Sequence, residues 1–238
     1  KDHHAQIPDR LYPALLRKRY PVYQTIYQCN LTINRVNAKP AAMIKRLFDI
    51  LLSFILIALF IPLFIIFALW IKFDSKGPVI YKQTRVGKND RDFRLIKFRT
   101  MYPTAEKKGL ITVGKKDSRI TRAGIFMRRY KLDELPQLLN IFVGDMSFVG
   151  PRPEVRPYVD LYSDEQKKVL SVKPGLTDYA SLEFVRENEI LETYPDPEKA
   201  YIEKIMPAKL KLNLRYINEQ SFLTDLKILF GTIRAILQ

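Results

Sequence analysis

The stretch of sequence that decides the fold is ILLSFILIALFIPLFIIFALWI, residues 50–71. All of its residues are apolar except Ser53 and the proline Pro62. An α-helix needs about 20 consecutive apolar residues to match a bilayer core, and helices of soluble proteins rarely stay apolar on every side for so long. The stretch therefore predicts a membrane helix, and a buried core helix is the less favoured alternative. It is too long, and too far from the first residue, for a cleaved signal peptide.

The residues around and within this stretch bear on how it enters the membrane. Basic residues flank it on both sides: Lys45 and Arg46 before it, and after it Lys72, Lys76, Lys82 and Arg85. Because cytoplasmic flanks carry the excess of Lys and Arg, this pattern places both ends on the cytoplasmic side. Pro62 lies near the middle, where a missing N–H and a ring clash kink a helix. These residues fit equally well a re-entrant helix that dips in and returns, and a kinked helix that spans.

Composition limits the kinds of partner and of chemistry. The chain of 238 residues carries 40 Lys and Arg against 25 Asp and Glu, a formal charge of +15. This balance favours an anionic partner, which would be a nucleic acid, an acidic lipid surface or a phosphorylated substrate. The single cysteine, Cys29, excludes an intramolecular disulfide and a thiolate metal cluster. Both histidines, His3 and His4, lie at a polar chain end, so catalysis would use carboxylates, lysines, hydroxyls or a bound metal.

The rest of the sequence predicts an α+β fold that is mainly helical. Residues 1–40 show no helical pattern and are interpreted as an N-terminal arm of unknown role; residues 41–76 form the membrane anchor, and residues 77–238 a cytoplasmic domain apposed to the membrane. Residues 79–86 and 93–98 predict a small β-hairpin around a turn at 87–90. Helices are predicted at residues 123–129, 135–142, 163–170, 196–218 and 223–237. The last helix fits an amphipathic helix lying at the bilayer interface and a helix packed in the core equally well.

The segment between Arg85 and Lys131 is strongly basic. It holds fifteen Lys or Arg residues and four acidic residues, a net +11 of the total +15. Beside a membrane segment such a block would be attracted to acidic headgroups, or its arginines would bind phosphate oxygens in bidentate fashion. A nucleic-acid partner is disfavoured, because no aromatic-stacking or groove-reading motif accompanies the charge.

The basic segment leads into Asp133 and Glu134, two adjacent carboxylates. Apolar residues at 135, 138, 139 and 142 have helical spacing, which predicts the pair at a helix N-terminus with Asp133 as the N-cap. There the helix dipole and the nearby Arg128 and Arg129 would keep the carboxylates ionised and attract a phosphate or a metal–phosphate complex. One carboxylate could attack phosphorus while the other holds a divalent cation. Two plain capping acids are the alternative.

Five segments, in order along the chain, carry a resemblance to a known family. They are KRLFD at residues 45–49, KFRTM at 97–101, LDELPQ at 132–137, GDMSFVGPRPE at 144–154 and KPGLT at 173–177. From residue 45 to the C-terminus the chain closely resembles the bacterial sugar transferases known as monotopic phosphoglycosyl transferases, or polyprenyl-phosphate sugar-1-phosphate transferases. A match as long as residues 144–154 is not expected by chance.

The resemblance implies a reaction and a location. In this family the apolar segment is a re-entrant helix broken near its proline, here Pro62, with both ends on the cytoplasmic face of the bacterial inner membrane. Asp133 would attack the sugar-bearing phosphate of a UDP-sugar and release UMP, and the phosphate of undecaprenyl phosphate would then take the phosphosugar from Asp133. Glu134 would hold Mg²⁺. Family members often have serine before the proline, whereas this chain has Ile61. The reaction would be the first membrane step of glycoconjugate biosynthesis.

Further site residues follow from the same resemblance. The residues expected to bind phosphate or to form the nucleotide pocket are Arg128, Lys97, Arg99, Pro151, Arg152 and Pro153. For the long basic side chains, a surface or headgroup contact is the alternative. After KPGLT many members continue GWAQVNGR, whereas residues 178–186 here read DYASLEFVR. Arg186 does not align cleanly with the family arginine, which predicts a different sugar preference or a subfamily pocket.

The expected partners are therefore a UDP-sugar, polyprenyl phosphate and a lipid bilayer, and no nucleic acid. The sugar, the pathway and a homo-oligomeric state stay open. Two other functions compete with this hypothesis: a catalytically idle membrane-bound scaffold, and a membrane protein that binds nucleic acid. Neither accounts for the Asp133–Glu134 pair together with the segment from Pro151 to Pro153.

Overall fold

The computed structural model describes residues 21–103, 117–185 and 187–237, and their side chains except those of residues 21–41 and 236–237. The chain divides into two compact units, Lys1–Lys45 and Arg46–Gln238. The contacts discussed below lie in the second unit. As predicted, the described residues are mainly helical and contain a small antiparallel hairpin. Residues 1–20 of the predicted arm, which runs from 1 to 40, and the basic residues between 104 and 116 lie outside the described ranges.

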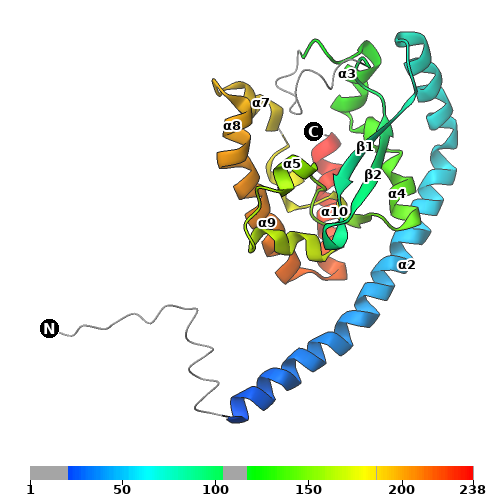
Figure 1. Ribbon diagram of the computed structural model, residues 1–238. Coiled ribbons are helices and arrows are strands. Elements are labelled where there is room, and N and C mark those ends of the chain that lie inside the picture. Colours follow the sequence, from blue (N-terminus) through cyan, green and yellow to red (C-terminus); the bar gives the residue numbers. More distant parts are fainter. Residues whose placement is uncertain (1–20, 104–116, 186, 238) are drawn as a thin grey trace. The chain divides into compact units, whose positions relative to one another are not determined.

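Helix α2, Pro21–Asp74, contains the apolar stretch and is continuous through Pro62 (Figure 1). Within it Ala42–Asp74, whose most apolar 18 residues have a mean hydropathy of 3.1, is the one described helical segment that is long and apolar enough to cross a membrane. The helix begins at Pro21. Because residues 1–40 show no helical pattern, the sequence predicted no helix there, and for residues 21–40 this prediction is wrong. Once a helix exists, each further residue adds one hydrogen bond, so a helix can extend into a segment without apolar periodicity.

The predicted hairpin is confirmed as β1, Ile80–Val86, and β2, Asp92–Phe98, with Ile80 opposite Phe98 and Val86 opposite Asp92. The turn between them contains Asn89 and Asp90 at φ 57° and 61°, and Asn and Asp are the residues that tolerate this left-handed region after glycine.

Helix α4, Gln137–Val143, packs against the hairpin, and one buried amide of the helix forms hydrogen bonds to β2. Asn140 accepts a hydrogen bond from the backbone N–H of Ile96 at 3.0 Å and donates one to the carbonyl of Arg94 at 2.8 Å. Both ends of the amide are thus paired, which makes this buried polar group a stable link between helix and strand. Figure 1 shows α4 lying between the hairpin and α2.

A second, parallel pair of strands brings two of the family-like segments together, and the sequence patterns did not predict it. In β3, Ser147–Val149, Ser147 pairs with Gly175 of β4, Gly175–Thr177, and Val149 pairs with Thr177. A Cβ on Gly175 would lie 2.2 Å from the nitrogen of Gly150, so only glycine allows this approach. Strands of three residues are too short to show an alternating pattern.

Several helices agree with the sequence and others do not. The predictions are confirmed for α3, Arg122–Arg129, for α4 and for α10, Phe222–Leu237; residues 196–218 form α8, Pro197–Ala200, a π-helical turn, Tyr201–Ile205, and α9, Met206–Glu219. The predicted helix at 163–170 is instead a 3-10 helix, Gln166–Ser171. Three short helices were not predicted, because four to six residues carry too little periodicity: α5, Arg156–Val159, α6, Tyr179–Glu183, and α7, Glu187–Glu192.

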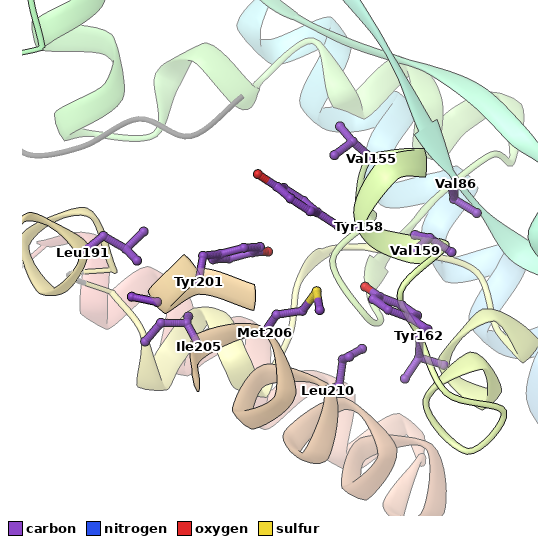
Figure 2. Packing of buried hydrophobic residues seen from close by; sticks show 12 residues of the cluster. Val86, Val155, Tyr158, Val159, Tyr162, Leu191, Tyr201, Ile205, Met206 and Leu210 are labelled. Carbon is purple, nitrogen blue, oxygen red and sulfur yellow. The ribbon is translucent and has the colours of Figure 1, made fainter. Parts of the chain in front are cut away.

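Three apolar clusters of the described residues hold these elements together, and the two largest are described here. Figure 2 shows the first, in which Tyr158 and Tyr201 lie with ring centroids 5.1 Å apart and contact the side chains of α9. The second joins β2, α4, β3 and α10 to half-buried side chains of α2. In α10, Ile228 is buried in this cluster, whereas Leu223 and Phe230 are exposed. The helix therefore has both a core face and an exposed apolar face.

Polar contacts fasten the start of the apolar segment to the rest of its unit. At the end of α4, Arg46 donates hydrogen bonds to the carbonyl of Ile141 at 2.6 Å and to the carbonyl of Phe142 at 2.7 Å. Asp49, 2% exposed, accepts from Ser147 Oγ at 3.1 Å and from the backbone N–H of Phe148 at 3.2 Å. The carboxylate thereby ties α2 to β3.

Hydrogen bonds also attach the end of α2, and the residues just after it, to the rest of the unit. The guanidinium of Arg99 donates to the carbonyl of Pro78 at 2.5 Å, and to Ser75 Oγ at 2.7 Å and its carbonyl at 2.9 Å. Asp74 accepts from the backbone N–H of Ala123, in the first turn of α3, at 3.1 Å. Both ends of the apolar segment therefore contact one and the same compact unit.

We expect Asp49→Ala to lower the free energy of unfolding by about 2–3 kcal/mol, because the Ser147 hydroxyl and the Phe148 N–H lose a charged acceptor inside the protein. Asp49→Asn keeps one acceptor oxygen and should cost less than half of this. Urea unfolding in detergent, followed by circular dichroism, measures both variants. Equal stability of Asp49→Ala and the unchanged protein would contradict the importance of this contact.

Candidate active site

The two candidate catalytic carboxylates lie in a 3-10 turn, Leu132–Glu134, just before α4. The predicted N-cap role of Asp133 is wrong, because its side chain makes no capping bond and α4 begins after Pro136. With Asp133 as the N-cap, Pro136 would occupy the third helical position, where it has no N–H to donate. Lys131, before the turn, has φ 56°, an uncommon value for a residue with a side chain.

Asp133 is buried, yet no hydrogen bond to its carboxylate is found in the described part of the chain. It is 7% exposed. Burial, and after it the charge of Glu134, raises the pKa of the Asp133 carboxyl, while Lys97 and Arg128 act in the opposite direction. The Asp133 carboxylate thus lies near the cations Lys97 and Arg128 but accepts no hydrogen bond from the described residues. Such a carboxylate can attack an electrophile that enters the site.

Glu134 differs, because Arg152 holds both of its oxygens. Arg152 Nη2 donates to Glu134 Oε1, and Nη1 donates to Oε2 at 3.2 Å. Burial alone would raise the pKa of Glu134, but the charge and hydrogen bonds of Arg152 lower it to about 2. The neighbouring carboxyls therefore have pKa values displaced in opposite directions, an arrangement typical of groups with separate roles.

Two further cations face Asp133 from separate elements. Lys97, on β2, has a pKa lowered to about 8 by burial and by the charge of Arg85. Arg128, in the last turn of α3, donates from Nε to Thr100 Oγ1 at 2.9 Å, which fixes its direction. The hairpin, which is distant in sequence, and α3, which directly precedes the turn, thus both bring positive charge to Asp133.

Arg152 is itself held by the segment in which the chain departs from the family pattern. Asp178, fully buried, accepts from the Arg152 backbone N–H at 3.1 Å through Oδ2. Its Oδ1 accepts from the Ser181 N–H at 2.6 Å and caps α6. The first residue of the departure therefore links the loop carrying Arg152 to α6.

Most of the predicted site residues line one large cavity of about 1610 Å³. They are Asp133, Glu134, Lys97, Arg128, Pro151, Arg152 and Pro153. Apolar side chains of α2 line the same cavity: Phe48, Leu52, Leu56 and Phe60. Charged and apolar walls therefore face one space.

Two of the predicted site residues do not line the large cavity, and two residues beside it were not predicted. Arg99 does not line the cavity, since its guanidinium binds carbonyls of the segment that follows α2, so its contacts give no support to a role in phosphate binding. Pro62 lies on an exposed side of α2, and Arg186 is outside the described residues. Arg85 and Gln137 line a small cavity of about 30 Å³ beside Glu134; in the sequence, Arg85 was only one of fifteen basic residues.

The donor set limits how a metal could bind. No cluster of three or more His, Cys, Asp or Glu residues occurs within the described ranges, so a cage made of protein ligands alone is not found there. Mg²⁺ commonly binds through one or two carboxylates together with substrate phosphates. Asp133 and Glu134 fit that kind of site, provided that the metal shares Glu134 with Arg152.

Comparison with known proteins places this cavity in a family context. The bacterial sugar transferase family matches residues 40–238. A protein of Aeromonas hydrophila, named UDP-N-acetylgalactosamine-undecaprenyl-phosphate N-acetylgalactosaminephosphotransferase, is 40% identical over 200 residues, which are 82% of this chain and 44% of that protein. A UDP-glucose:undecaprenyl-phosphate glucose-1-phosphate transferase of Caulobacter vibrioides is 36% identical over 196 residues, 81% of this chain and 69% of that one. The exopolysaccharide production protein PSS of Rhizobium leguminosarum bv. phaseoli is 37% identical over 198 residues, 80% and 94% of the two chains. This chain thus spans less than half of the Aeromonas protein and nearly all of the Rhizobium protein.

Anion binding in the cavity should weaken as the pH rises through about 8, because Lys97 then loses its proton and its charge. We expect the affinity for sulfate, measured by isothermal titration calorimetry, to fall several-fold between about pH 7 and 9, since sulfate itself does not titrate there. Lys97→Arg stays charged and should keep its affinity over this range. A sulfate affinity that does not change with pH in the unchanged protein would contradict this role of Lys97.

Proposed function

This chain belongs to the bacterial sugar transferase family, and from that premise we propose that it transfers a sugar 1-phosphate from a UDP-sugar to undecaprenyl phosphate. The observation that carries the proposal is the buried Asp133 carboxylate, without a hydrogen-bond donor in the described part of the chain, in a cavity with both cationic and apolar walls. The names of the Aeromonas and Caulobacter relatives support both substrates.

In the first step, an Asp133 oxygen attacks the sugar-bearing phosphorus of the donor. An Asp133 O–P bond forms while the bond from that phosphorus to the bridging oxygen of UMP breaks, and UMP leaves with the bonding electrons. Attack needs the ionised carboxylate, and burial opposes ionisation. Lys97 and Arg128 offset this cost and also stabilise charge on the phosphoryl oxygens. The product is a phosphosugar bound to Asp133.

In the second step, a phosphate oxygen of undecaprenyl phosphate attacks the same phosphorus. The bond from phosphorus to Asp133 breaks, the carboxylate is restored, and the sugar diphosphate stays on the lipid. No net proton is consumed. One cationic cavity can serve both substrates in turn, because each presents phosphate to the same carboxylate, which is the logic of a two-step covalent reaction.

The metal of this proposal is Mg²⁺, for which Glu134 would be the protein ligand. When bound, it would supply positive charge to the diphosphate of the donor and so make UMP a better leaving group. Arg152 keeps Glu134 ionised through a pKa of about 2, so the ligand carries its charge at any physiological pH. Pro151 and Pro153 flank Arg152 and would shape the nucleotide pocket.

We further propose that the apolar part of α2 enters and leaves the bilayer on the cytoplasmic face of the inner membrane. Support comes from the two fastened ends: Asp49 binds β3 and Asp74 binds the start of α3, both in one compact unit. Large apolar side chains of α2 such as Phe54 and Leu59 are 60% and 64% exposed. Exposed apolar surface of this extent marks contact with a membrane or a partner.

Exposed apolar residues of α3 and α4 extend this surface. The rings of Trp70 and Phe126 lie 5.3 Å apart, and those of Phe54 and Phe142 lie 6.3 Å apart. Ile125, Leu139 and Val143 are exposed on the same two helices. The proposed membrane contact therefore includes the helices that carry Arg128 and follow Asp133, which would bring the cavity close to the headgroups.

We expect Asp133→Asn to reduce UMP release at least about 1,000-fold, because the nucleophile is lost, and Glu134→Gln to reduce it about 100-fold, because the metal ligand loses its charge. The assay uses protein in nanodiscs with Mg²⁺, undecaprenyl phosphate and a panel of UDP-sugars, and EDTA should stop it. Asp164→Asn, at an exposed position outside the cavity, is the control and should be fully active. A broad panel that yields no UMP from folded, lipid-bound protein would favour the idle scaffold.

The membrane arrangement predicts that both flanks of the apolar segment react from the same side. In a Cys29→Ser background, Ala42→Cys and Lys76→Cys place single thiols at exposed positions before and after it. A maleimide that cannot cross membranes should label both in inverted vesicles and neither in intact spheroplasts, as for Glu192→Cys in the cytoplasmic domain. Labelling of either flank in spheroplasts would establish a spanning helix instead.

A further inference from the structure

Gln137, the first residue of α4, carries a side-chain amide that is buried and unpaired. The residue is 2% exposed, and its Nε2 has no hydrogen-bond partner among the described residues. Most buried polar atoms in proteins are paired, since an unpaired donor has given up its hydrogen bonds to water and gained none. Gln137, three residues after Glu134, is an exception, which indicates that its amide finds a hydrogen-bond acceptor on a bound ligand.

The position of the amide indicates what that ligand is. Gln137 lines the cavity of about 30 Å³ together with Arg85, Lys97, Glu134 and Arg152. Three of those four charged residues are cations, so the cavity favours an anionic group. Its volume suits a single oxygen atom, since about 10–15 Å³ suffices for one water. Apart from Gln137 and Leu95, its lining residues also line the large cavity that holds Asp133, so the two spaces adjoin.

A second amide on the same helix shows that the fold can pair such a group. Asn140, 1% exposed, both accepts from Ile96 and donates to Arg94. Gln137 lies one turn earlier on α4 and lines a cavity with charged side chains of several elements, yet none of the described residues accepts a hydrogen bond from its Nε2. Of these two buried amides on α4, only that of Gln137 is unpaired, and only Gln137 lines the small cavity.

We propose that Gln137 is a further substrate-binding residue, whose amide donates a hydrogen bond to a phosphoryl oxygen that enters the small cavity between Lys97 and Arg152. The inference rests on the proposed function, which offers two sources of that oxygen, the diphosphate of the nucleotide sugar and the phosphate of the lipid carrier. Both present the same anionic acceptor. Gln137 takes part in no covalent step; it orients the phosphate on which Asp133 acts.

The test compares Gln137→Met, which keeps the length of the side chain and removes the amide, with Asn140→Leu, which removes a paired amide from the same helix. We expect Gln137→Met to unfold at the same or a higher temperature, because no hydrogen bond is lost in the free protein, and to slow transfer about tenfold or more. Asn140→Leu should unfold at a lower temperature, because Ile96 N–H and Arg94 C=O lose their partner. Gln137→Glu has the original shape but puts an anion in place of a donor, and should be slower still.

The two half-reactions identify which phosphate is bound. Slower UMP release by Gln137→Met without lipid carrier would assign the oxygen to the donor; a raised KM for undecaprenyl phosphate, with UMP release unchanged, would assign it to the lipid. Rates equal to those of the unchanged protein in both half-reactions would overturn the proposal. So would a Gln137→Met variant with a lowered unfolding temperature, because the amide would then have a structural partner such as a fixed water.

Failure of the proposed function would be recognised separately, because the unchanged protein would then release no UMP. In that case binding of inorganic pyrophosphate, measured by calorimetry at one pH, tests the small cavity by itself. Weaker binding by Gln137→Met than by the unchanged protein supports the phosphate contact, and equal binding overturns it.

Discussion

The ion pair between Arg152 and Glu134 joins two parts of the chain that have no sequence proximity. Glu134 lies in the turn before α4 and Arg152 in the loop after β3, and that loop is anchored by the β3–β4 pairing and by the buried Asp178. A bidentate arginine–carboxylate pair fixes orientation as well as separation. The same contact that sets the direction of Glu134 therefore also decides that Asp133 is the carboxylate left open to the cavity.

Burial acts on both carboxyls, and the different outcome comes from their partners. Taking a carboxylate out of water raises its pKa. For Glu134 the charge and two hydrogen bonds of Arg152 outweigh this effect, whereas for Asp133 the charges of Lys97, Arg128 and Lys131 offset it without a hydrogen bond, and its pKa stays raised. A carboxylate whose oxygens accept hydrogen bonds has fewer lone pairs available for attack. Geometry thus favours Asp133 as the nucleophile and Glu134 as the charged group that stays in place, a division that the order Asp-Glu alone does not specify.

How much could be predicted from the sequence depended on the range of the contacts involved. The hairpin follows from local alternation and from turn residues such as Asn89, and the apolar stretch follows from its length. The β3–β4 pairing needs Gly150 and Gly175 to meet across more than twenty residues, which no local pattern signals. The N-cap prediction for Asp133 failed through a local cause, the missing N–H of Pro136. Gln137 lies in the family-like segment at residues 132–137, but the sequence does not show that its amide is unpaired, because that depends on which neighbours the fold places around it.

The double attachment of α2 has a consequence for the proposed lipid substrate. A helix attached at Asp49 and again at Asp74 cannot tilt freely against its own unit, so in the proposed membrane arrangement the height of the cavity relative to the bilayer is set by the protein and not by a flexible linker. The proposed acceptor is a long apolar chain that ends in a phosphate. Moving that chain into water would expose several CH₂ groups, at about 0.8 kcal/mol each. A cavity lined both by apolar residues such as Phe48 and Leu52 and by Lys97 avoids this cost, because the phosphate can reach the cations while the chain stays among apolar side chains.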